Sequence, residues 1–394
     1  MLDGTVRTAA LSAFNILEMA MSRNKLCSLV AATFTPMTQD NEINLSLIGQ
    51  YVDYLVKVQG IKNIFVNGTT GEGISLTTEE RKLLAEEWIS QGKGKLDQVI
   101  IHVGSLSIKE SQQLAKHAAS YNASGIAVMS PCFFKPQNIG EGNADIVAQE
   151  ECEILATISI MREDVLEGLT SLKVDNLHSP DGLYPRLLKE AREDIADALR
   201  IIFNSSLDTE ALIEFLKEVA SAAPSVPFYY YHIPELTGVS FNIVDLLDGI
   251  EERIPTFQGL KFTSSDLLDY GQCVHKYKDR FDLLFGKDEL LLSAMILGAS
   301  GAVGSTYNYL GNLCNKMLTV TKSGDYNLAR EHQAVVQEFV GYVNRIGFGV
   351  AENKATMILV SGIPLGPPRL PLLKCSEEKQ AKILAKLKTL GILT

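Results

Sequence analysis

The sequence lacks the features that several classes of protein require. Its 36 Lys and Arg are outnumbered by 47 Asp and Glu, and the net charge of −11 argues against a general nucleic-acid binder, which usually presents a basic patch. No apolar run approaches the roughly 18 residues of a membrane-spanning helix. Six cysteines and six histidines are scattered without CxxC or HExxH spacing, which disfavours a metal site and favours free thiols in a reducing compartment.

Nucleotide-binding and export signals are equally weak. No GxGxxG follows the first apolar segment, and the glycine-rich turn NGTTGEG (67–73) lacks the GK[ST] of a P-loop. Residues 1–22 contain Asp3 and Glu18 and no cleavage pattern, so they make a poor signal peptide and a weak transit peptide. We expect an unstructured N-terminal extension over 1–22 and a cytoplasmic protein.

The sequence does contain a regular alternation of short apolar segments and helical patterns, beginning at residue 28. Near-continuous apolar strands, each followed by a helix, indicate a parallel sheet covered by helices. Eight strands is the number that closes a (β/α)8 barrel, or TIM barrel, and an open doubly wound sheet is the alternative. The eight expected strands lie in 28–36, 63–67, 98–104, 125–131, 227–232, 257–262, 282–286 and 301–306.

The spacing of these segments breaks once, between the fourth and fifth strands. Removing residues 137–206 restores the interval of a βα unit, so we predict an insertion there and a barrel formed by 23–136 and 207–320. This stretch holds 14 Asp and Glu against 6 Lys and Arg, which is −8 of the total −11. After the barrel, helical patterns near 325–347, 350–361 and 377–390 predict a C-terminal helical segment over 321–394.

The predicted insertion contains an amphipathic helix over 184–203, preceded by the turn sequence SPDG. One interpretation is a helical addition over the mouth of the barrel. The stretch VDNLHSPDGLYPRLLKEAREDIADAL (174–199) also resembles the segment just upstream of reverse transcriptase in non-LTR retrotransposons. That resemblance implies a retrotransposon-derived fragment without polymerase chemistry, because the catalytic part is absent.

Lys261 is the most unusual residue of the pattern, because it interrupts the apolar strand FQGLKF (257–262). Most lysines on strands are solvated or extend to the surface. An amine enclosed in a barrel is instead favoured in its neutral form, which can attack a ketone or an aldehyde to give a Schiff base. In a barrel of this kind the active site lies at the carboxyl ends of the strands, where Lys261 is expected.

Two further segments converge on the same end of the barrel. The turn NGTTGEG follows the second strand, and its successive backbone N–H groups suit a small anion such as a carboxylate, although an ordinary turn has the same composition. The fifth strand ends in YYYHIP (229–234), where alternation places Tyr229 and Tyr231 on one face. Tyr231 is a candidate proton shuttle beside the imine, and packing is its other possible role.

The motifs VNGTTGEG, YYYHIPELTG, QGLKF and GSTYN together resemble the N-acetylneuraminate lyase and dihydrodipicolinate synthase superfamily of class I, pyruvate-handling aldolases. The resemblance covers roughly 23–136 and 207–394 and is strongest to the vertebrate N-acetylneuraminate lyases, which cleave sialic acid to N-acetylmannosamine and pyruvate. It implies a carbon–carbon lyase that uses a covalent Schiff base and no metal or organic cofactor. It also implies a homotetramer whose other partners are these small molecules alone.

Carried onto this chain, the resemblance makes Lys261 the Schiff-base lysine and Tyr231 the proton donor and acceptor. Thr69 and Thr70 would bind the pyruvate carboxylate. The hydroxyl-rich part of the sugar would be held by Thr263, Gly286, Asp288, Glu289 and Ser305.

Two positions distinguish the branches of this superfamily. The synthase branch has an arginine where this chain has Leu236, and a tyrosine where this chain offers Phe133 and Phe134. An acidic second substrate is therefore disfavoured, and a neutral sugar fits better. The alternatives are another pyruvate-dependent aldolase of the superfamily, and a catalytically silent variant whose insertion blocks the pocket or the oligomer.

Overall fold

The computed structural model describes residues 25–132, 209–347 and 349–393 of the chain. Within these ranges eight parallel strands pair in chain order and close into a barrel, because β8 also pairs with β1. The predicted (β/α)8 barrel is confirmed, and the open doubly wound sheet is wrong. The strands are Leu29–Ala32 (β1), Asn63–Val66 (β2), Gln98–His102 (β3), Gly125–Met129 (β4), Phe228–His232 (β5), Phe257–Phe262 (β6), Asp282–Phe285 (β7) and Gly301–Gly304 (β8).

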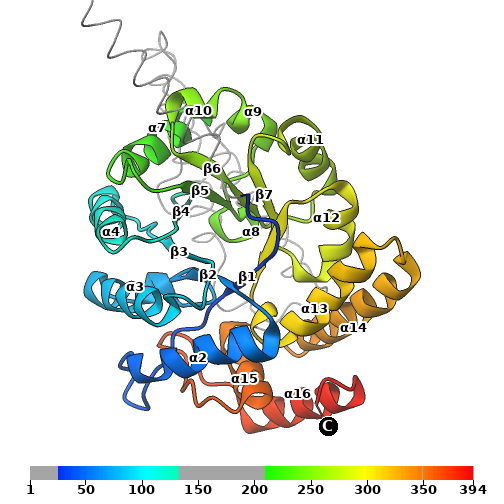
Figure 1. The fold of residues 1–394 in the computed structure, drawn as a ribbon. Helices are drawn as coiled ribbons and strands as arrows, with labels where there is room; N and C mark the ends of the chain where they lie inside the picture. Colours follow the sequence, from blue (N-terminus) through cyan, green and yellow to red (C-terminus); the bar gives the residue numbers. More distant parts are fainter. Residues whose placement is uncertain (1–24, 133–208, 348, 394) are drawn as a thin grey trace, which may run out of the picture. The chain divides into compact units, whose positions relative to one another are not determined.

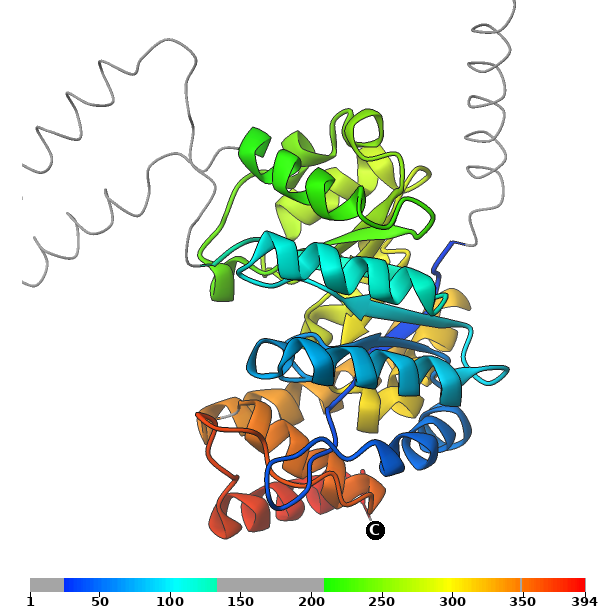
Figure 2. The same ribbon diagram turned by 90° about the vertical axis from the view of Figure 1, so that its left-hand side faces the viewer.

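Helices surround the ring of strands (Figure 1). Those that follow strands β1 to β7 are Ile48–Tyr54 (α2), Thr78–Gly92 (α3), Ile108–Ser120 (α4), Thr209–Ala220 (α7), Pro234–Thr237 (α8), Ile243–Leu247 (α9), Ile250–Arg253 (α10), Leu267–Tyr277 (α11) and Leu291–Leu297 (α12). After β8 come Tyr307–Lys322 (α13), Tyr326–Arg345 (α14), Val350–Ser361 (α15) and Glu377–Thr389 (α16). Helices α14 and α15 pack on α13, and α16 packs on α14 and α15, so the C-terminal segment forms an extra layer beside the barrel (Figure 2).

The pattern of the sequence explains this arrangement. Side chains alternate along each strand, so each apolar segment buries one set of residues against the helices and the other set inside the ring. On β5, for example, Tyr230 packs outward with the helices, whereas Tyr229 and Tyr231 point into the barrel, as predicted. The barrel is therefore a packed core whose chemistry is restricted to its rim.

The helix predicted after the first strand is less regular than its periodicity suggests. Leu45–Leu47 forms a 3-10 turn, α2 follows, and Leu55–Gln59 forms a π-helical turn that ends at Gly60, whose φ is +65°. Further on, the expected C-terminal helices agree with α14, α15 and α16 to within about two residues, the usual uncertainty of helix ends.

Some predicted segments lie outside the described residues. They are the extension over 1–22 and the whole insertion over 137–206, including its amphipathic helix and the stretch that resembles a retrotransposon. Of the part of the chain that the structure does describe, no helix is both long enough and apolar enough to cross a membrane.

The amino-terminal end of the barrel is closed by a buried carboxylate. Asp282 on β7 is 1% exposed and accepts hydrogen bonds from the hydroxyl of Tyr229 at 3.0 Å, the amide of Gln258 at 3.2 Å and the backbone N–H of Leu26 at 3.2 Å. Tyr229 reaches it across β6, where a Cβ at Gly259 would lie 2.1 Å from the Asp282 carbonyl oxygen. Burial raises the pKa of the Asp282 carboxyl, and these donors oppose the rise.

This arrangement predicts that Tyr229→Phe lowers the free energy of unfolding by about 1–2 kcal/mol, because a buried carboxylate loses one donor. Urea unfolding followed by fluorescence or circular dichroism measures the change. Tyr326→Phe is the matched control: Tyr326 is 52% exposed, so the same substitution there should change stability by less than about 0.5 kcal/mol. Equal unfolding midpoints for the Tyr229 variant and the wild type would contradict this account.

Candidate active site

A pocket of about 350 Å³ opens at the carboxyl ends of the strands. All nine residues singled out from the sequence line it: Thr69, Thr70, Tyr231, Lys261, Thr263, Gly286, Asp288, Glu289 and Ser305. They come from the ends of β2, β5, β6, β7 and β8 and from the loops that follow. The topology therefore brings the predicted residues together, although proximity alone does not assign a role to any of them.

Lys261 points into the barrel and is 7% exposed, whereas its neighbours Leu260 and Phe262 pack outward against the helices. Its Nζ lies 4.1 Å from the centre of the Tyr231 ring and 5.1 Å from that of Phe65. Among the described residues, no carboxylate lies within ion-pair distance of this amine (4.0 Å). The amine is thus enclosed by two aromatic rings and has no carboxylate partner among the described residues.

Tyr231 is the register partner of Lys261 on the adjacent strand, so both side chains point to the same layer of the barrel. Its hydroxyl lies 3.5 Å from the hydroxyl of Thr69. The phenol therefore lies between the amine and the glycine-rich turn. A group at this place can move a proton to or from a molecule held by both.

His102 on β3 completes the aromatic wall, and its ring centre lies 6.2 Å from that of Tyr231. It is 2% exposed, and burial, together with the nearby positive charge of Arg81, lowers its pKa to about 3. The imidazole is consequently neutral at ordinary pH and adds no positive charge beside the amine. The sequence did not predict a role for this residue, because a single histidine in an apolar strand carries no local signal.

The turn that follows β2 has a constrained backbone. Asn67 and Glu72 both have positive φ, at +61° and +58°, which non-glycine residues rarely adopt. A Cβ at Gly73 would lie 1.9 Å from the Asn67 carbonyl oxygen, so only glycine fits there. The N–H of Glu72 donates to the carbonyl of Thr69 at 3.1 Å, which closes the turn and fixes the Thr69 peptide.

The opposite side of the pocket is acidic. Asp288 is 6% exposed, and one of its carboxylate oxygens accepts from the N–H and the hydroxyl of Thr306, at 2.9 and 2.6 Å. Its other oxygen has no hydrogen-bond partner among the described residues, and neither has the hydroxyl of Thr263. Burial raises the pKa of Asp288 to about 6, so it is largely ionised at pH 7.

Two glycines leave space in this wall for the side chains of Asp288 and Thr263. A Cβ at Gly304 would lie 1.8 Å from the unpartnered oxygen of Asp288, and one at Gly286 would lie 2.0 Å from the hydroxyl of Thr263. Unsatisfied buried acceptors are rare in folded proteins and suit a ligand that donates hydrogen bonds, such as a polyhydroxylated molecule.

The C-terminal helices also line the pocket, which the sequence analysis did not foresee. Val340 and Asn344 of α14 and Val350 and Asn353 of α15 all contribute. Asn353 donates to the hydroxyl of Ser305 at 2.7 Å and accepts from the hydroxyl of Tyr309 at 3.0 Å. No local pattern could reveal this, because the contact depends on how a late helix packs over the barrel.

The opening of the pocket is lined by an exposed apolar residue and an ion pair. Leu236 is 62% exposed and lines the opening, where Lys287 and Glu235 form an ion pair at 2.6 Å. Phe133 and Phe134 lie outside the described residues. Within the described parts of the chain, no three His, Cys, Asp or Glu side chains lie close enough together to hold a metal ion.

Comparison with known proteins places this pocket in context. The chain is 50% identical over 377 residues to N-acetylneuraminate lyase of Mus musculus, an alignment that covers 95% of this chain and 96% of the mouse protein. Among solved structures it is similar to N-acetylneuraminate lyase (sialic acid aldolase) from Aliivibrio salmonicida, with a TM-score of 0.72, 31% identity and coverage of 94% and 99% of the two chains. The Proteus mirabilis N-acetylneuraminate lyase gives a TM-score of 0.72 at 29% identity, with coverage of 94% of this chain and 100% of that one.

The model of the Dihydrodipicolinate synthetase family matches residues 25–149 and 196–390. The unmatched stretch, 150–195, falls within the predicted insertion over 137–206, whose bounds remain a prediction. The match covers well over half of the chain and includes every residue that lines the pocket. This chain therefore belongs to the Dihydrodipicolinate synthetase family.

Proposed function

We propose that the chain is a class I aldolase that cleaves N-acetylneuraminate to N-acetylmannosamine and pyruvate through a Schiff base on Lys261. The observation that supports this most directly is the register of β5 and β6, which sets Tyr231 beside an enclosed amine, with the Thr69 hydroxyl 3.5 Å from the phenol. The identity of 50% to the mouse N-acetylneuraminate lyase over nearly the whole chain supports the same substrate.

In the proposed reaction, the neutral amine of Lys261 attacks the C2 ketone of the open-chain sugar acid, and water leaves as the imine forms. The protonated imine then withdraws electrons from the neighbouring carbon. Thr69 and Thr70 hold the carboxylate through the hydroxyls and N–H groups of their turn. No metal or organic cofactor takes part.

Tyr231 gives its proton to the hydroxyl that leaves as water when the imine forms, and then accepts the proton of the C4 hydroxyl as the C3–C4 bond breaks. The electrons of that bond pass into the imine, which gives an enamine on Lys261 and releases N-acetylmannosamine. Protonation of the enamine carbon and hydrolysis of the imine release pyruvate and restore the free amine. The proton transfers of the carbon–carbon cleavage take place near Tyr231, and the substrate stays covalently bound to Lys261 from imine formation to hydrolysis.

The sugar tail is held by the opposite wall. The free oxygen of Asp288 accepts from a sugar hydroxyl, and the hydroxyls of Thr263 and Ser305 can donate or accept. Glu289 and the room left by Gly286 extend this surface. A ligand that lacks these hydroxyls leaves buried polar groups unpaired, which gives the site its selectivity.

A neutral aldehyde product fits this pocket better than an acidic one. The wall that includes Asp288 and Glu289 repels a second carboxylate, and Leu236 at the mouth offers it no cation. We further propose a cytoplasmic homotetramer. The family resemblance supports the assembly, and the scattered free cysteines, Cys27 among them, support the reducing compartment.

Borohydride reduction in the presence of pyruvate tests the covalent step. We expect a stable carboxyethyl adduct on Lys261, found by peptide mass spectrometry, because reduction traps the imine. Lys261→Met should form none, whereas Lys287→Met should form it normally, since Lys287 also lines the pocket but is paired with Glu235. An adduct on another lysine, or none on folded wild-type protein, would refute the role of Lys261.

Tyr231→Phe tests the proton shuttle. We expect kcat for sialic acid cleavage to fall by about 10²–10⁴-fold, because the C4 hydroxyl loses its acceptor, while pyruvate can still be trapped on Lys261. A coupled pyruvate assay and the borohydride reaction measure the two effects separately. Tyr230→Phe is the matched control, since Tyr230 points away from the pocket and bonds Ser130 at 2.7 Å. Cleavage at wild-type rate in the Tyr231 variant would exclude the shuttle.

Deletion of residues 137–206 tests whether the predicted insertion silences the enzyme. We expect equal kcat and KM with and without this stretch, because the part that the family model leaves unmatched, 150–195, lies within it and every residue of the pocket lies outside it. Lengthening a loop costs little by itself, about 0.6 kcal/mol per doubling. Activity that appears only after deletion would instead support the catalytically silent alternative.

A further inference from the structure

Glu72, in the same turn as Thr69 and Thr70, holds a carboxylate that water does not reach. Its side chain is 0% exposed, and it pairs at 3.1 Å with the amine of Lys354 on α15, whose side chain is 1% exposed. The amine also donates to the carbonyl of Pro367 at 2.8 Å, and the second carboxylate oxygen accepts from the N–H of Arg369 at 2.6 Å. Every described partner of this carboxylate thus belongs to the C-terminal segment.

The backbone conformation of Glu72 is one that favours glycine, so the presence of a carboxylate side chain there needs an explanation. Its φ is +58°, a conformation in which glycine meets no penalty and other residues do. Glycines stand on both sides, at 71 and 73, yet this position carries a long acidic side chain. A strained backbone conformation persists where several contacts hold it in place. Here the amine of Lys354 and the N–H of Arg369 hold the carboxylate, and the hydrogen bond to the Thr69 carbonyl holds the backbone.

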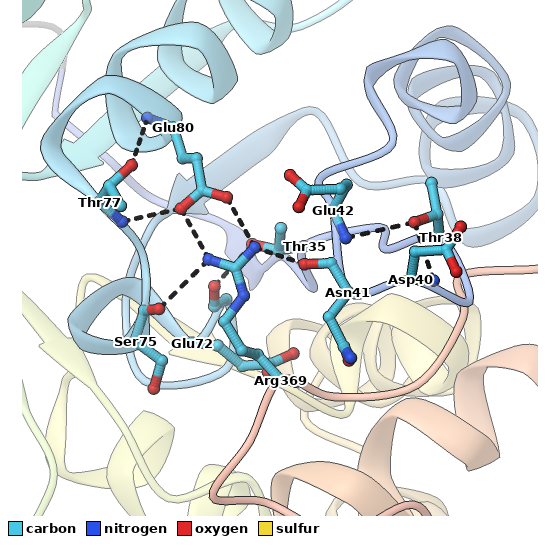
Figure 3. Close-up of polar contacts among 11 residues, drawn as sticks. Thr35, Thr38, Asp40, Asn41, Glu42, Glu72, Ser75, Thr77, Glu80 and Arg369 are labelled. Carbon is cyan, nitrogen blue, oxygen red and sulfur yellow. Dashed lines mark hydrogen bonds and ion pairs between the residues drawn. The ribbon is translucent and has the colours of Figure 1, made fainter.

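Arg369 fastens the next part of the same loop (Figure 3). Its guanidinium makes two bonds of 2.6 Å to the carboxylate of Glu80, near the start of α3, and reaches the carbonyls of Ser75 at 3.3 Å and Asn41 at 2.5 Å. Glu80 also caps α3 by accepting from the N–H of Thr77 at 2.8 Å. The C-terminal segment therefore holds the loop from Glu72 to Glu80 at both ends, through Lys354 at Glu72 and through Arg369 at Glu80.

One hydrogen bond connects Glu72 to the Thr69 peptide of the turn proposed to bind the carboxylate. The N–H of Glu72 donates to the Thr69 carbonyl, so the position of Glu72 sets the orientation of the Thr69 peptide. On α15, Asn353 bonds Ser305 on the other side of the pocket, one residue before Lys354. Helix α15 thus ties both walls of the pocket with consecutive residues.

We propose that Lys354 is a positioning residue for the substrate carboxylate: by holding Glu72 it holds the turn that binds the anion. The inference rests on the proposed function. Lys354 touches no substrate, and it acts only through Glu72 and the Thr69 peptide. A role in stability alone would weaken every ligand of the pocket, whereas a role in positioning weakens ligands that carry the carboxylate.

Two ketones separate these roles. Pyruvate and methyl pyruvate both form an imine with Lys261, but only pyruvate presents a charged carboxylate to the turn. Borohydride trapping on Lys261 at graded ketone concentrations gives a half-saturating concentration for each. In Lys354→Met we expect this concentration to rise by about tenfold or more for pyruvate and by less than about threefold for methyl pyruvate, because small misplacements weaken oriented contacts strongly.

The double variant Glu72→Gln/Lys354→Met keeps the test valid if the single variant folds poorly. It leaves no buried charge without a partner, and such neutral replacements of buried ion pairs are usually tolerated. It still lacks the ionic anchor, so we expect the same selective loss of pyruvate. The matched control is Glu352→Gln on the same helix: Glu352 pairs with Lys379 at 2.7 Å and caps Gly349 at 3.0 Å without touching Glu72, and the ratio of the two ketones should not change.

Each outcome is decisive. A selective rise for pyruvate in the single or the double variant, with the control unchanged, supports the positioning role. Equal shifts for both ketones in folded variants, or no shift, overturn it while leaving the Schiff base intact. Absence of any adduct on folded wild-type protein overturns the proposed function, and the inference falls with it.

Discussion

A closed parallel barrel forces the side chains of one register layer toward a common axis, and the pairing of Tyr231 with Lys261 is the instance on which this site depends. Sliding β6 by one residue would turn Lys261 outward among the helices and bring Leu260 or Phe262 inside. The hydrogen bond from Tyr229 on β5 to Asp282 on β7 lies two residues below this pair and holds the register, because it crosses β6 only where Gly259 leaves room. The same alignment of β5 and β6 therefore places the stabilising Tyr229–Asp282 bond at one end of the barrel and the Tyr231–Lys261 pair at the other.

The two walls of the pocket differ in their electrostatic environment: one is aromatic and the other is acidic. Near Lys261 the surroundings are aromatic and His102 is uncharged, so the protonated imine of the proposed reaction would be the dominant charge on this side. On the far side, Asp288 offers an unpartnered oxygen. An anionic head and a hydroxyl-rich tail therefore meet different environments within one pocket, which favours one orientation of the substrate.

The sequence predicted most of this fold, because strand spacing and apolar runs are local and the barrel repeats them eight times. Lys261 was conspicuous for the same reason, as a charged residue within an apolar strand. The contribution of α15 was not predictable: in VAENKATMILVS the residues Asn353 and Lys354 look like part of a solvated helix face. Their burial depends on partners 48 and 282 residues earlier in the chain, and no periodicity encodes such a pairing.

The dependence of Glu72 on Lys354 has a consequence for how the protein is made. At the usual elongation rates, the 282 residues between them take the ribosome roughly 15 to 60 s to add. During that interval the emerging barrel can assemble strand by strand, while the carboxylate of Glu72 stays hydrated and its turn unfastened. With the positioning role proposed for Lys354, the polypeptide reaches its full affinity for a keto acid only once its final helices have docked.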